Sequence, residues 1–256
     1  MAFDDLRQGI REIESIADPT AGEIWIGCPE SLCGPLLTPA IKRLLRVRPR
    51  VNFHVAHVYT LSAELEFPEL RERSVDLVLA RLVKPFGEFD FEEDLRVEHL
   101  FDEDLLVVAG RENPWARRRK IDLVELADAS WVLPPNSWNM LRVREAFAAI
   151  GHGMPRTTVE TFSVALRNEL LASGEFVAAV PGSMLHMNAE HGLKVLPISL
   201  PVRPWPAVMV TLKNRTVAPP VEHFAQCVRC VVTARHWPQT TLNSSRGKRT
   251  NAAAHA

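Results

Sequence analysis

Short apolar strands alternate with amphipathic helical segments along most of the chain. In the stretch 22–79 the apolar runs have the spacing of three strands, with a helical pattern in each interval; the strands are expected at 23–27, 51–58 and 75–80. The last of them is almost wholly apolar, which is typical of a strand buried on both faces of a parallel sheet. This part of the chain therefore predicts a βαβαβ unit.

The same order of elements returns in the second half of the chain. Further strands are expected at 131–133, 157–160 and 176–180, with helices at 138–150 and 162–173. Two strands around an acidic turn fill 95–110, and a late strand at 207–212 precedes a helix at 218–235. No sequence identity links the halves, so only the pattern repeats. The pattern predicts an α/β fold with two subdomains of similar design.

Both ends of the chain differ from this pattern. The first 18 residues carry apolar side chains three and four apart, the spacing of a heptad seam: Phe3, Leu6, Ile10, Ile13 and Ala17. Either this helix lies on its own domain, or it forms one strand of a dimeric coiled coil that is marginal at this length. A chain that begins inside a seam suggests a missing N-terminal module. Residues 237–256 lack apolar periodicity and are expected to be disordered.

Composition narrows the class of protein. The chain has 46% hydrophobic and 24% charged residues with a formal net charge of -1, so it can build a core but has no basic excess for nucleic acid. No apolar run is long enough to span a membrane, and no signal peptide precedes the first strand, so a cytoplasmic protein is expected. Four cysteines in 256 residues do not make a disulfide framework.

Five segments carry a likeness to a known family. They are GEIWIGCPESLCGPLLTPAIKRLLRVRPRV, ELRERSVDLVLARL, EHLFDEDLLVVAGRENPWA, WVLPP and ETFSVALRNELLASGEFVAAVPGSM. In this order they resemble the effector-binding domain of LysR-type transcriptional regulators, over residues 3–236. The resemblance implies two Rossmann-like subdomains joined by two crossing strands near 105–110 and 204–209, as in type 2 periplasmic-binding proteins. Subdomain I would comprise 19–107 and 207–236, and subdomain II would comprise 108–206.

The resemblance also implies partners. Residues 1–18 look like the end of the family's linker and dimerisation helix, but the winged helix-turn-helix that normally precedes it is absent from this sequence. DNA binding is therefore expected only through a missing N-terminal domain. A homodimer or homotetramer is expected, with a small-molecule effector held between the subdomains against helix N-termini.

In the first subdomain the loop Pro29–Leu32, which includes Ser31 and Leu32, opens the first helix and is the expected ligand wall. Helix N-termini offer unpaired N–H groups and a positive partial charge, which suit a carboxylate or phosphate. Ser31 either donates its hydroxyl to such an anion or caps its own helix. Thr60 is the other candidate here, unless it is an ordinary threonine at a strand end.

The facing wall is expected from two tripeptides that precede helices: Asn136-Ser137-Trp138 and Thr161-Phe162-Ser163. Asn136 or Ser137 can cap the first of these helices, and Thr161 is the expected cap of the second. The ring of Trp138 either forms an apolar wall of the pocket or packs in the core.

Two residues near the strand ends complete the predicted site. Arg81 follows the third strand, where it either pairs with a ligand carboxylate or forms a surface salt bridge to the nearby acidic loop. Phe101 either lines the floor of the cleft or belongs to the core. This mixture of hydroxyls, amide donors and aromatic rings favours a small organic acid with an apolar or aromatic body.

The remaining signals are weak. The C-x-x-C of Cys227 and Cys230 lies in a helical pattern rather than a knuckle turn, so no metal is expected. Cys33 is either an inert thiol or a redox-sensitive one near a helix N-terminus. No catalytic motif or convergent acid–base set is visible, so neither an enzyme nor a cofactor is expected. The alternative function is a stand-alone solute-binding protein of a transport system, which would carry a signal peptide.

Overall fold

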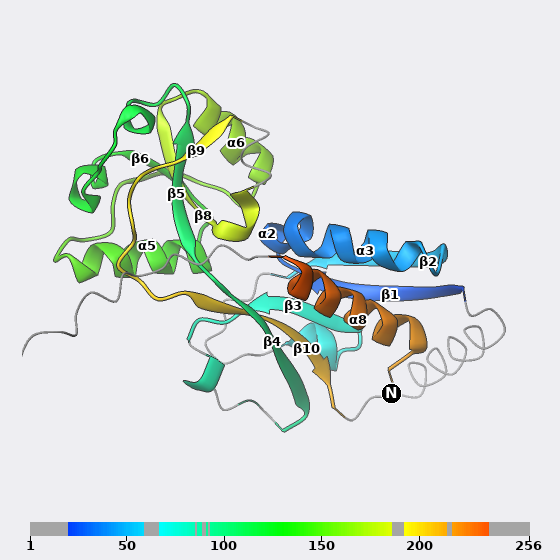
Figure 1. Cartoon of the computed structure of the whole chain (residues 1–256). Coiled ribbons are helices and arrows are strands. Elements are labelled where there is room, and N and C mark those ends of the chain that lie inside the picture. Colours follow the sequence, from blue (N-terminus) through cyan, green and yellow to red (C-terminus); the bar gives the residue numbers. More distant parts are fainter. Residues whose placement is uncertain are drawn as a thin grey trace, which may run out of the picture.

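The computed structural model describes residues 20–58, 67–84, 86–88, 91, 93–185, 192–213 and 217–235. In this part of the chain two five-stranded sheets form, each covered by helices (Figure 1). The expected α/β fold with two subdomains is confirmed. The expected linker helix at 1–18 and the expected disordered tail lie outside the described residues.

The first sheet has the strand order β2-β1-β3-β10-β4. Its parallel strands are β1 (Ala21–Cys28), β2 (Arg50–His57) and β3 (Leu77–Arg81). The strand β10 (Trp205–Leu212) runs antiparallel between β3 and β4 (Leu95–Glu103). Every residue of β3 is buried, as its apolar sequence predicted.

Helices cover the first sheet. After β1 the chain turns directly into a helical stretch of α2 (Glu30–Leu32), η1 (Cys33–Leu37) and α3 (Thr38–Leu45). This stretch packs beside α8 (Pro219–Ala234), and a short helix α4 (Pro68–Arg71) precedes β3. The apolar faces enclose a core that includes Ile24, Ile26, Leu36, Leu44 and Phe224, each 0% exposed.

The second sheet has the order β7-β6-β8-β5-β9. Its parallel strands are β6 (Ser130–Leu133), β7 (Thr157–Glu160) and β8 (Phe176–Pro181); β5 (Leu105–Gly110) runs antiparallel to β8 and to β9 (Leu193–Val195). The helices α5 (Trp138–Ala149) and α6 (Val164–Ala172) connect the parallel strands. Short 3-10 turns occur at η2 (Phe86–Glu88), η3 (Pro114–Arg117), η4 (Leu123–Leu126) and η5 (Gly182–Met184).

The chain passes between the sheets twice. The first passage is at Asp104, between β4 and β5, and the second is the segment 196–204, between β9 and β10 (Figure 1). Both come slightly earlier than the predicted 105–110 and 204–209. The reason is strand pairing: Leu105 already pairs with Pro181 in the second sheet, and Trp205 already pairs with Glu103 in the first.

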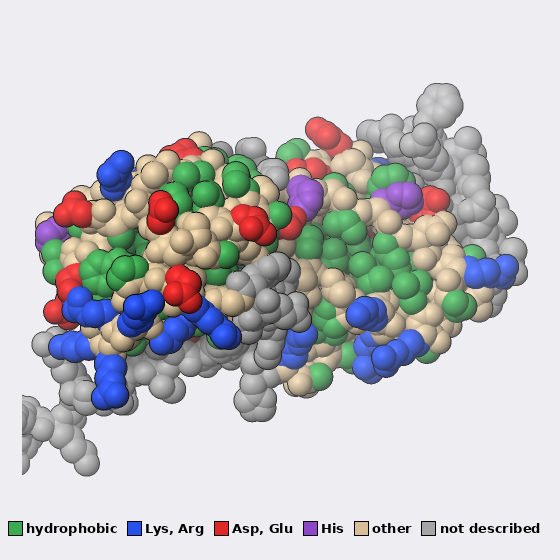
Figure 2. Space-filling view, turned by 90° about the horizontal axis from the view of Figure 1, so that it is seen from above, with side chains coloured by type: hydrophobic (Ala, Val, Ile, Leu, Met, Phe, Trp, Pro, Cys, Tyr) green, Lys and Arg blue, Asp and Glu red, His purple; other side chains and the backbone are tan. Residues whose placement is uncertain are grey.

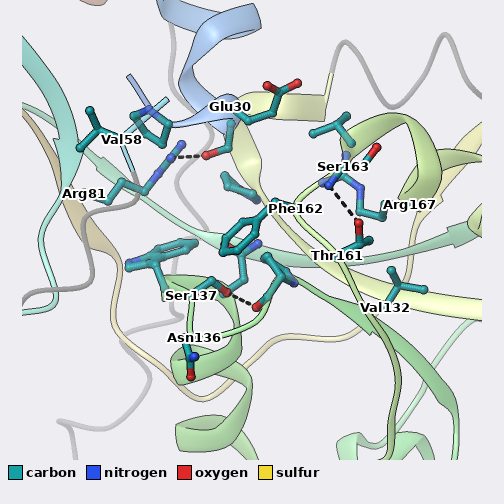
Figure 3. Close-up of a pocket in the computed structure, with 17 residues that line it drawn as sticks. Glu30, Val58, Arg81, Val132, Asn136, Ser137, Thr161, Phe162, Ser163 and Arg167 are labelled. Carbon is teal, nitrogen blue, oxygen red and sulfur yellow. Dashed lines mark hydrogen bonds between the residues drawn. The ribbon is translucent and has the colours of Figure 1, made fainter. Parts of the chain in front are cut away.

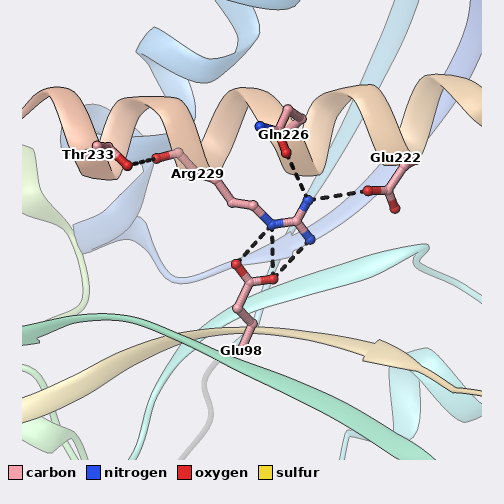
Figure 4. Close-up of polar contacts among 5 residues, drawn as sticks. All are labelled: Glu98, Glu222, Gln226, Arg229 and Thr233. Carbon is pink, nitrogen blue, oxygen red and sulfur yellow. Dashed lines mark hydrogen bonds and ion pairs between the residues drawn. The ribbon is translucent and has the colours of Figure 1, made fainter.

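A polar contact fixes α8 to strand β4. The Nε and Nη2 atoms of Arg229 donate to the two carboxylate oxygens of Glu98, both at 2.9 Å, and Nη1 donates to Glu222 at 3.2 Å (Figure 4). Hydrogen bonding to Glu98 raises the pKa of Arg229 above its ordinary value. The side chains of Arg229 and Glu98 are each 32% exposed, so water screens much of this attraction.

Charge is unevenly spread over the surface. Lys and Arg side chains gather along one edge of the half that carries the second sheet, at the left of Figure 2. The basic run Arg117–Lys120 belongs to this half and is exposed. None of the described helices is long and apolar enough to cross a membrane.

Candidate functional site

A cavity of about 100 Å³ lies where the two sheets face each other (Figure 3). The half with the first sheet contributes Pro29, Glu30, Ser31, Val58 and Arg81 to its lining. The half with the second sheet contributes Val132, Pro134, Asn136, Ser137, Trp138, Asn139, Thr161, Phe162, Ser163, Val164, Arg167 and Pro181. The cavity therefore lies between the C-terminal ends of parallel strands from both sheets, where ligands bind in open α/β folds.

Most of the residues predicted for the site meet in this cavity. They are Ser31, Arg81, Asn136, Ser137, Trp138, Thr161, Phe162 and Ser163. Thr60 lies outside the described residues.

Leu32 and Phe101 belong to the core beneath α3 and α8 instead of the lining. Leu32 is 0% exposed, and its N–H already donates to the Pro29 carbonyl at 2.9 Å. Phe101 is 5% exposed. The position of Leu32 in the helical turn points its side chain into the core, so its predicted place in the ligand wall is corrected. For Phe101 the core was one of the two predicted places, and its predicted role in the cleft floor is corrected.

Ser31 does not cap its helix, contrary to one of its two predicted roles. The helix begins at Glu30, its N-cap Pro29 makes no side-chain cap, and Ser31 therefore lies inside the first turn. Its Oγ accepts a hydrogen bond from Arg81 Nη1 at 2.6 Å. The hydroxyl thus faces the cavity, where a ligand can compete for it.

Arg81 is buried and forms a buried ion pair with Glu103. One of its two predicted roles was a surface salt bridge to the nearby acidic loop, and that prediction is wrong. Nη2 donates to Glu103 Oε2 at 2.8 Å, with side-chain exposures of 5% and 2%. The Glu103 carboxylate also accepts from the Ser183 N–H at 2.8 Å and from the Ser183 hydroxyl at 3.0 Å. A continuous polar network therefore runs from Ser31 in the first half, through the end of β4, to η5 in the second half.

Serine caps begin both helices of the facing wall. Ser137 Oγ accepts from the Met140 N–H at 3.2 Å and caps α5. Of the two candidate caps, Asn136 and Ser137, the structure therefore has Ser137. Ser163 caps α6 by accepting from the Leu166 N–H at 3.2 Å. Thr161 was the expected cap of α6, but its Oγ1 instead accepts from the Ser163 N–H at 3.0 Å and orders the approach to the helix.

Two aromatic rings give the cavity an apolar side. Trp138 is 7% exposed and packs edge-on against Trp205 with ring centroids 5.9 Å apart, so it serves both packing and lining. The Arg81 guanidinium lies 5.6 Å from the Trp138 ring. Phe162 is 39% exposed, and Figure 3 shows its ring among the residues that surround the cavity. An aromatic ring with this exposure adds apolar surface to the cavity.

Arg167 is a lining residue that the sequence reading missed. It is 8% exposed, and its Nε and Nη2 both donate to Asn168 Oδ1, at 3.2 and 3.0 Å. Burial lowers its pKa to about 10, against a smaller opposing effect of the Glu30 carboxylate, so it stays protonated at neutral pH. Among the described residues no carboxylate forms an ion pair with it, in contrast to Arg81. Arg167, Asn168 and Leu171 are the buried residues of α6. Two polar residues on the buried face of a helix are unusual, and this pattern in the sequence could have indicated a lining residue here.

A pair of thiols lies just behind the first wall. The Sγ atoms of Cys28 and Cys33 are 3.8 Å apart. Their hydrogen bond, together with burial, raises the pKa of Cys28, while the same hydrogen bond lowers the pKa of Cys33. Cys227 and Cys230 both lie within α8, so the C-x-x-C is helical, as predicted. Burial raises the pKa of the Cys227 thiol.

Two α/β halves, with a cavity between them that polar and apolar side chains line together, are the architecture of a bilobal ligand-binding domain. The sequence profile of the LysR substrate binding domain family matches residues 17–233, and the chain belongs to this family. The domain serves transcriptional regulators rather than enzymes, which agrees with the expectation that the chain is not an enzyme.

Curated relatives bear names that agree with the family. The chain is 27% identical over 236 residues to the HTH-type transcriptional regulator GalR of Pseudomonas putida, a match that covers 91% of this chain and 57% of that protein. It is 24% identical over 181 residues to the HTH-type transcriptional regulator GbpR of Rhizobium radiobacter, covering 70% of this chain and 58% of the relative. The chain thus spans less than two thirds of the length of these two proteins.

Solved structures show the same fold. A full-length OxyR variant from Pseudomonas aeruginosa superposes with a TM-score of 0.67 at 26% identity, over 89% of this chain and 76% of that one. The effector binding domain of QuiR in complex with shikimate gives a TM-score of 0.64 at 21% identity, over 83% of this chain and 98% of that one.

Proposed function

We propose that this chain is the effector-sensing domain of a LysR-type transcriptional regulator and binds a small organic acid in the cavity between its halves. The observation that carries the choice of an acid is Arg167, a buried cation in the cavity lining without a carboxylate partner among the described residues. A buried charge is costly unless it is paired, so a ligand carboxylate would supply the missing partner.

The rest of the lining suits such a ligand. The N-termini of α5 and α6 face the cavity and favour negative charge. Ser31 offers a hydroxyl, while Trp138 and Phe162 offer apolar surface to a cyclic or aromatic body. Shikimate, the molecule bound by the structurally similar QuiR domain, is itself a small cyclic carboxylic acid, which supports the class without naming the ligand of this chain.

We further propose how binding is transmitted. Residues 19–107 with 207–236 act as one subdomain and 108–206 as the other, and a ligand that contacts both shifts their relative angle. The signal reaches DNA through an N-terminal domain absent from this sequence, as the names and greater lengths of the relatives suggest. The parent protein would act in the cytoplasm as a homodimer or homotetramer.

Isothermal titration of the chain against aromatic and aliphatic carboxylates, each with its matching amide, tests the proposal. At least one acid should bind while its amide does not. Arg167→Gln should weaken that acid by about 10- to 150-fold, the equivalent of about 1.5–3 kcal/mol for a hydrogen bond to a charged group. Arg167→Lys should retain part of the affinity. The exposed Arg144→Gln on α5 is the matched control and should bind normally. Binding of neutral or cationic compounds alone would overturn the choice of an acid.

A further inference from the structure

Three side chains of different metal-binding chemistry converge beside Glu30, which lines the cavity. They are the carboxylate of Glu30, the thiol of Cys33 and the imidazole of His57, and their ligand atoms all lie within 4.8 Å of one another. We propose that these three residues bind one divalent transition-metal ion of the zinc type. No metal was expected from the sequence, because the C-x-x-C lies in a helical pattern and the spacing of Glu30, Cys33 and His57 along the chain does not show that they meet.

The fold brings the three residues together. Strands β1 and β2 are parallel neighbours, and Cys28 at the end of β1 is in register with His57 at the end of β2. The chain enters its helical stretch at Glu30, directly after β1, so Glu30 and Cys33 lie one turn apart on the same face. That face meets the end of β2, where the His57 ring stands.

The separations are close to those of a zinc site. Zinc bonds of about 2.0–2.3 Å in a tetrahedron place neighbouring ligand atoms roughly 3.3–3.8 Å apart. His57 Nε2 and Glu30 Oε2 are already 3.5 Å apart. The Cys33 sulfur, which lies within 4.8 Å of both, needs to approach by only about 1 Å, a shift that side-chain rotation can supply.

The surroundings of the three residues permit entry of an ion. The side chains of His57 and Glu30 are 49% and 44% exposed, so an ion can reach them from solvent. Cys28 Sγ lies 3.8 Å from Cys33 Sγ and is hydrogen-bonded to it, which supports the sulfur from the buried side. Three protein ligands leave one tetrahedral position open, as in zinc sites that exchange a water.

A sulfur donor distinguishes this cluster from an ordinary surface ion pair. On the same strand His54 Nε2 lies 3.8 Å from Glu23 Oε1, with similar exposure of 38% and 46%. In the described structure no third metal-binding side chain joins that pair. Thiolate and imidazole favour zinc, cobalt and similar ions over magnesium or calcium, which prefer oxygen ligands. His54 lies on β2 as His57 does and also pairs with a glutamate, but it has no sulfur neighbour, so it is a matched control.

The test uses the reduced 256-residue chain and metal ions alone. Titration with Co²⁺ should give the sulfur-to-cobalt charge-transfer and tetrahedral ligand-field absorption bands, which Zn²⁺ should abolish at one equivalent. Cys33→Ser should remove the charge-transfer band. His57→Ala and Glu30→Gln should each weaken Zn²⁺ binding by at least about tenfold, since even changes beside a ligand cost that much. His54→Ala and Cys230→Ser should bind as the unchanged chain does, and Mg²⁺ should not bind.

The proposal fails if Co²⁺ gives no charge-transfer band, if Cys33→Ser and His57→Ala bind Zn²⁺ as tightly as the unchanged chain, or if His54→Ala weakens binding equally. Because these substitutions lie on partly exposed side chains, circular dichroism of each variant separates loss of a ligand from loss of the fold. No organic acid is present in these titrations, so their outcome is independent of the proposed carboxylate site. Arg167→Gln, which leaves Glu30, Cys33 and His57 in place, should still give the charge-transfer band with Co²⁺.

Discussion

Replacing Glu103 with alanine should destabilise the protein strongly. The substitution leaves the Arg81 guanidinium, 5% exposed, without its carboxylate, and removes the acceptor of two hydrogen bonds from Ser183. Breaking a buried ion pair by deleting one partner costs about 3–5 kcal/mol, because the other charge stays buried without compensation. We expect a loss of this size in the free energy of unfolding.

The pair between Arg229 and Glu98 provides the scale for comparison. It joins the same two residue types at 2.9 Å, but each side chain is 32% exposed, and Arg229 keeps its hydrogen bonds to Glu222 and Gln226 when Glu98 is removed. Exposed pairs contribute about 0.2–1 kcal/mol. Glu103→Ala should therefore cost at least about 2 kcal/mol more than Glu98→Ala.

Urea unfolding followed by tryptophan fluorescence and by far-ultraviolet circular dichroism measures both losses. The two signals must coincide for a single free energy to be defined, and the m-value should stay constant. Glu103→Gln, which keeps an acceptor but not the charge, should fall between Glu103→Ala and the unchanged chain. Equal losses for Glu103→Ala and Glu98→Ala would refute the argument from burial.

Three further substitutions follow from the packing and can be measured by the same urea unfolding. Ser163→Ala removes the cap of α6 and should cost about 1 kcal/mol, whereas Ser163→Thr should keep most of it; equal losses would contradict the cap. Gly110→Ala should cost about 1–3 kcal/mol, because a Cβ there collides with the Leu171 carbonyl oxygen, while Gly153→Ala meets nothing within 4 Å and should be close to neutral. Leu32→Ala should cost about 2–5 kcal/mol, because the side chain is fully buried in the core. A smaller loss together with altered ligand binding would contradict this placement and assign Leu32 to the ligand site.

The fold was accessible from the sequence because apolar periodicity reports burial directly. The uninterrupted apolar run before Arg81 became β3, buried throughout, and the alternation of strands and helices gave both halves. The lining of the cavity followed from the same pattern. Helices that start after parallel strands all begin at one edge of a sheet, so Ser137 and Ser163 share an edge of the second sheet and Ser31 lies at the corresponding edge of the first; the way the two halves meet brings all three to one cavity.

Side-chain detail was less accessible because it depends on one-residue offsets and on distant partners. The helix α2 begins at Glu30, so Ser31 lies inside its first turn and does not cap it. The cap of α6 is Ser163 rather than the expected Thr161. Such small offsets decide which hydroxyl caps a helix and which makes other contacts. Arg81 finds its partner 22 residues away, at the end of β4, which β10 separates from β3 in the sheet. The acidic loop that lies close to Arg81 in the sequence therefore did not identify Glu103 as its partner.

The placement of β10 has a consequence for the order in which the chain folds during synthesis. This strand lies between β3 and β4, pairing Ala207 with both Arg81 and Phe101, so the first sheet stays incomplete until residue 212 has left the ribosome. The strands of the second sheet all lie within residues 105–195, so they can pair before β10 is made, and Leu196, Leu200 and Trp205 then complete the core of this half. Vectorial synthesis thus favours completion of the second half first, with two unpaired edges, β3 and β4, waiting for their shared neighbour. A nascent chain stalled before Trp205 would present those edges to other chains, which makes this region the most exposed to misassembly.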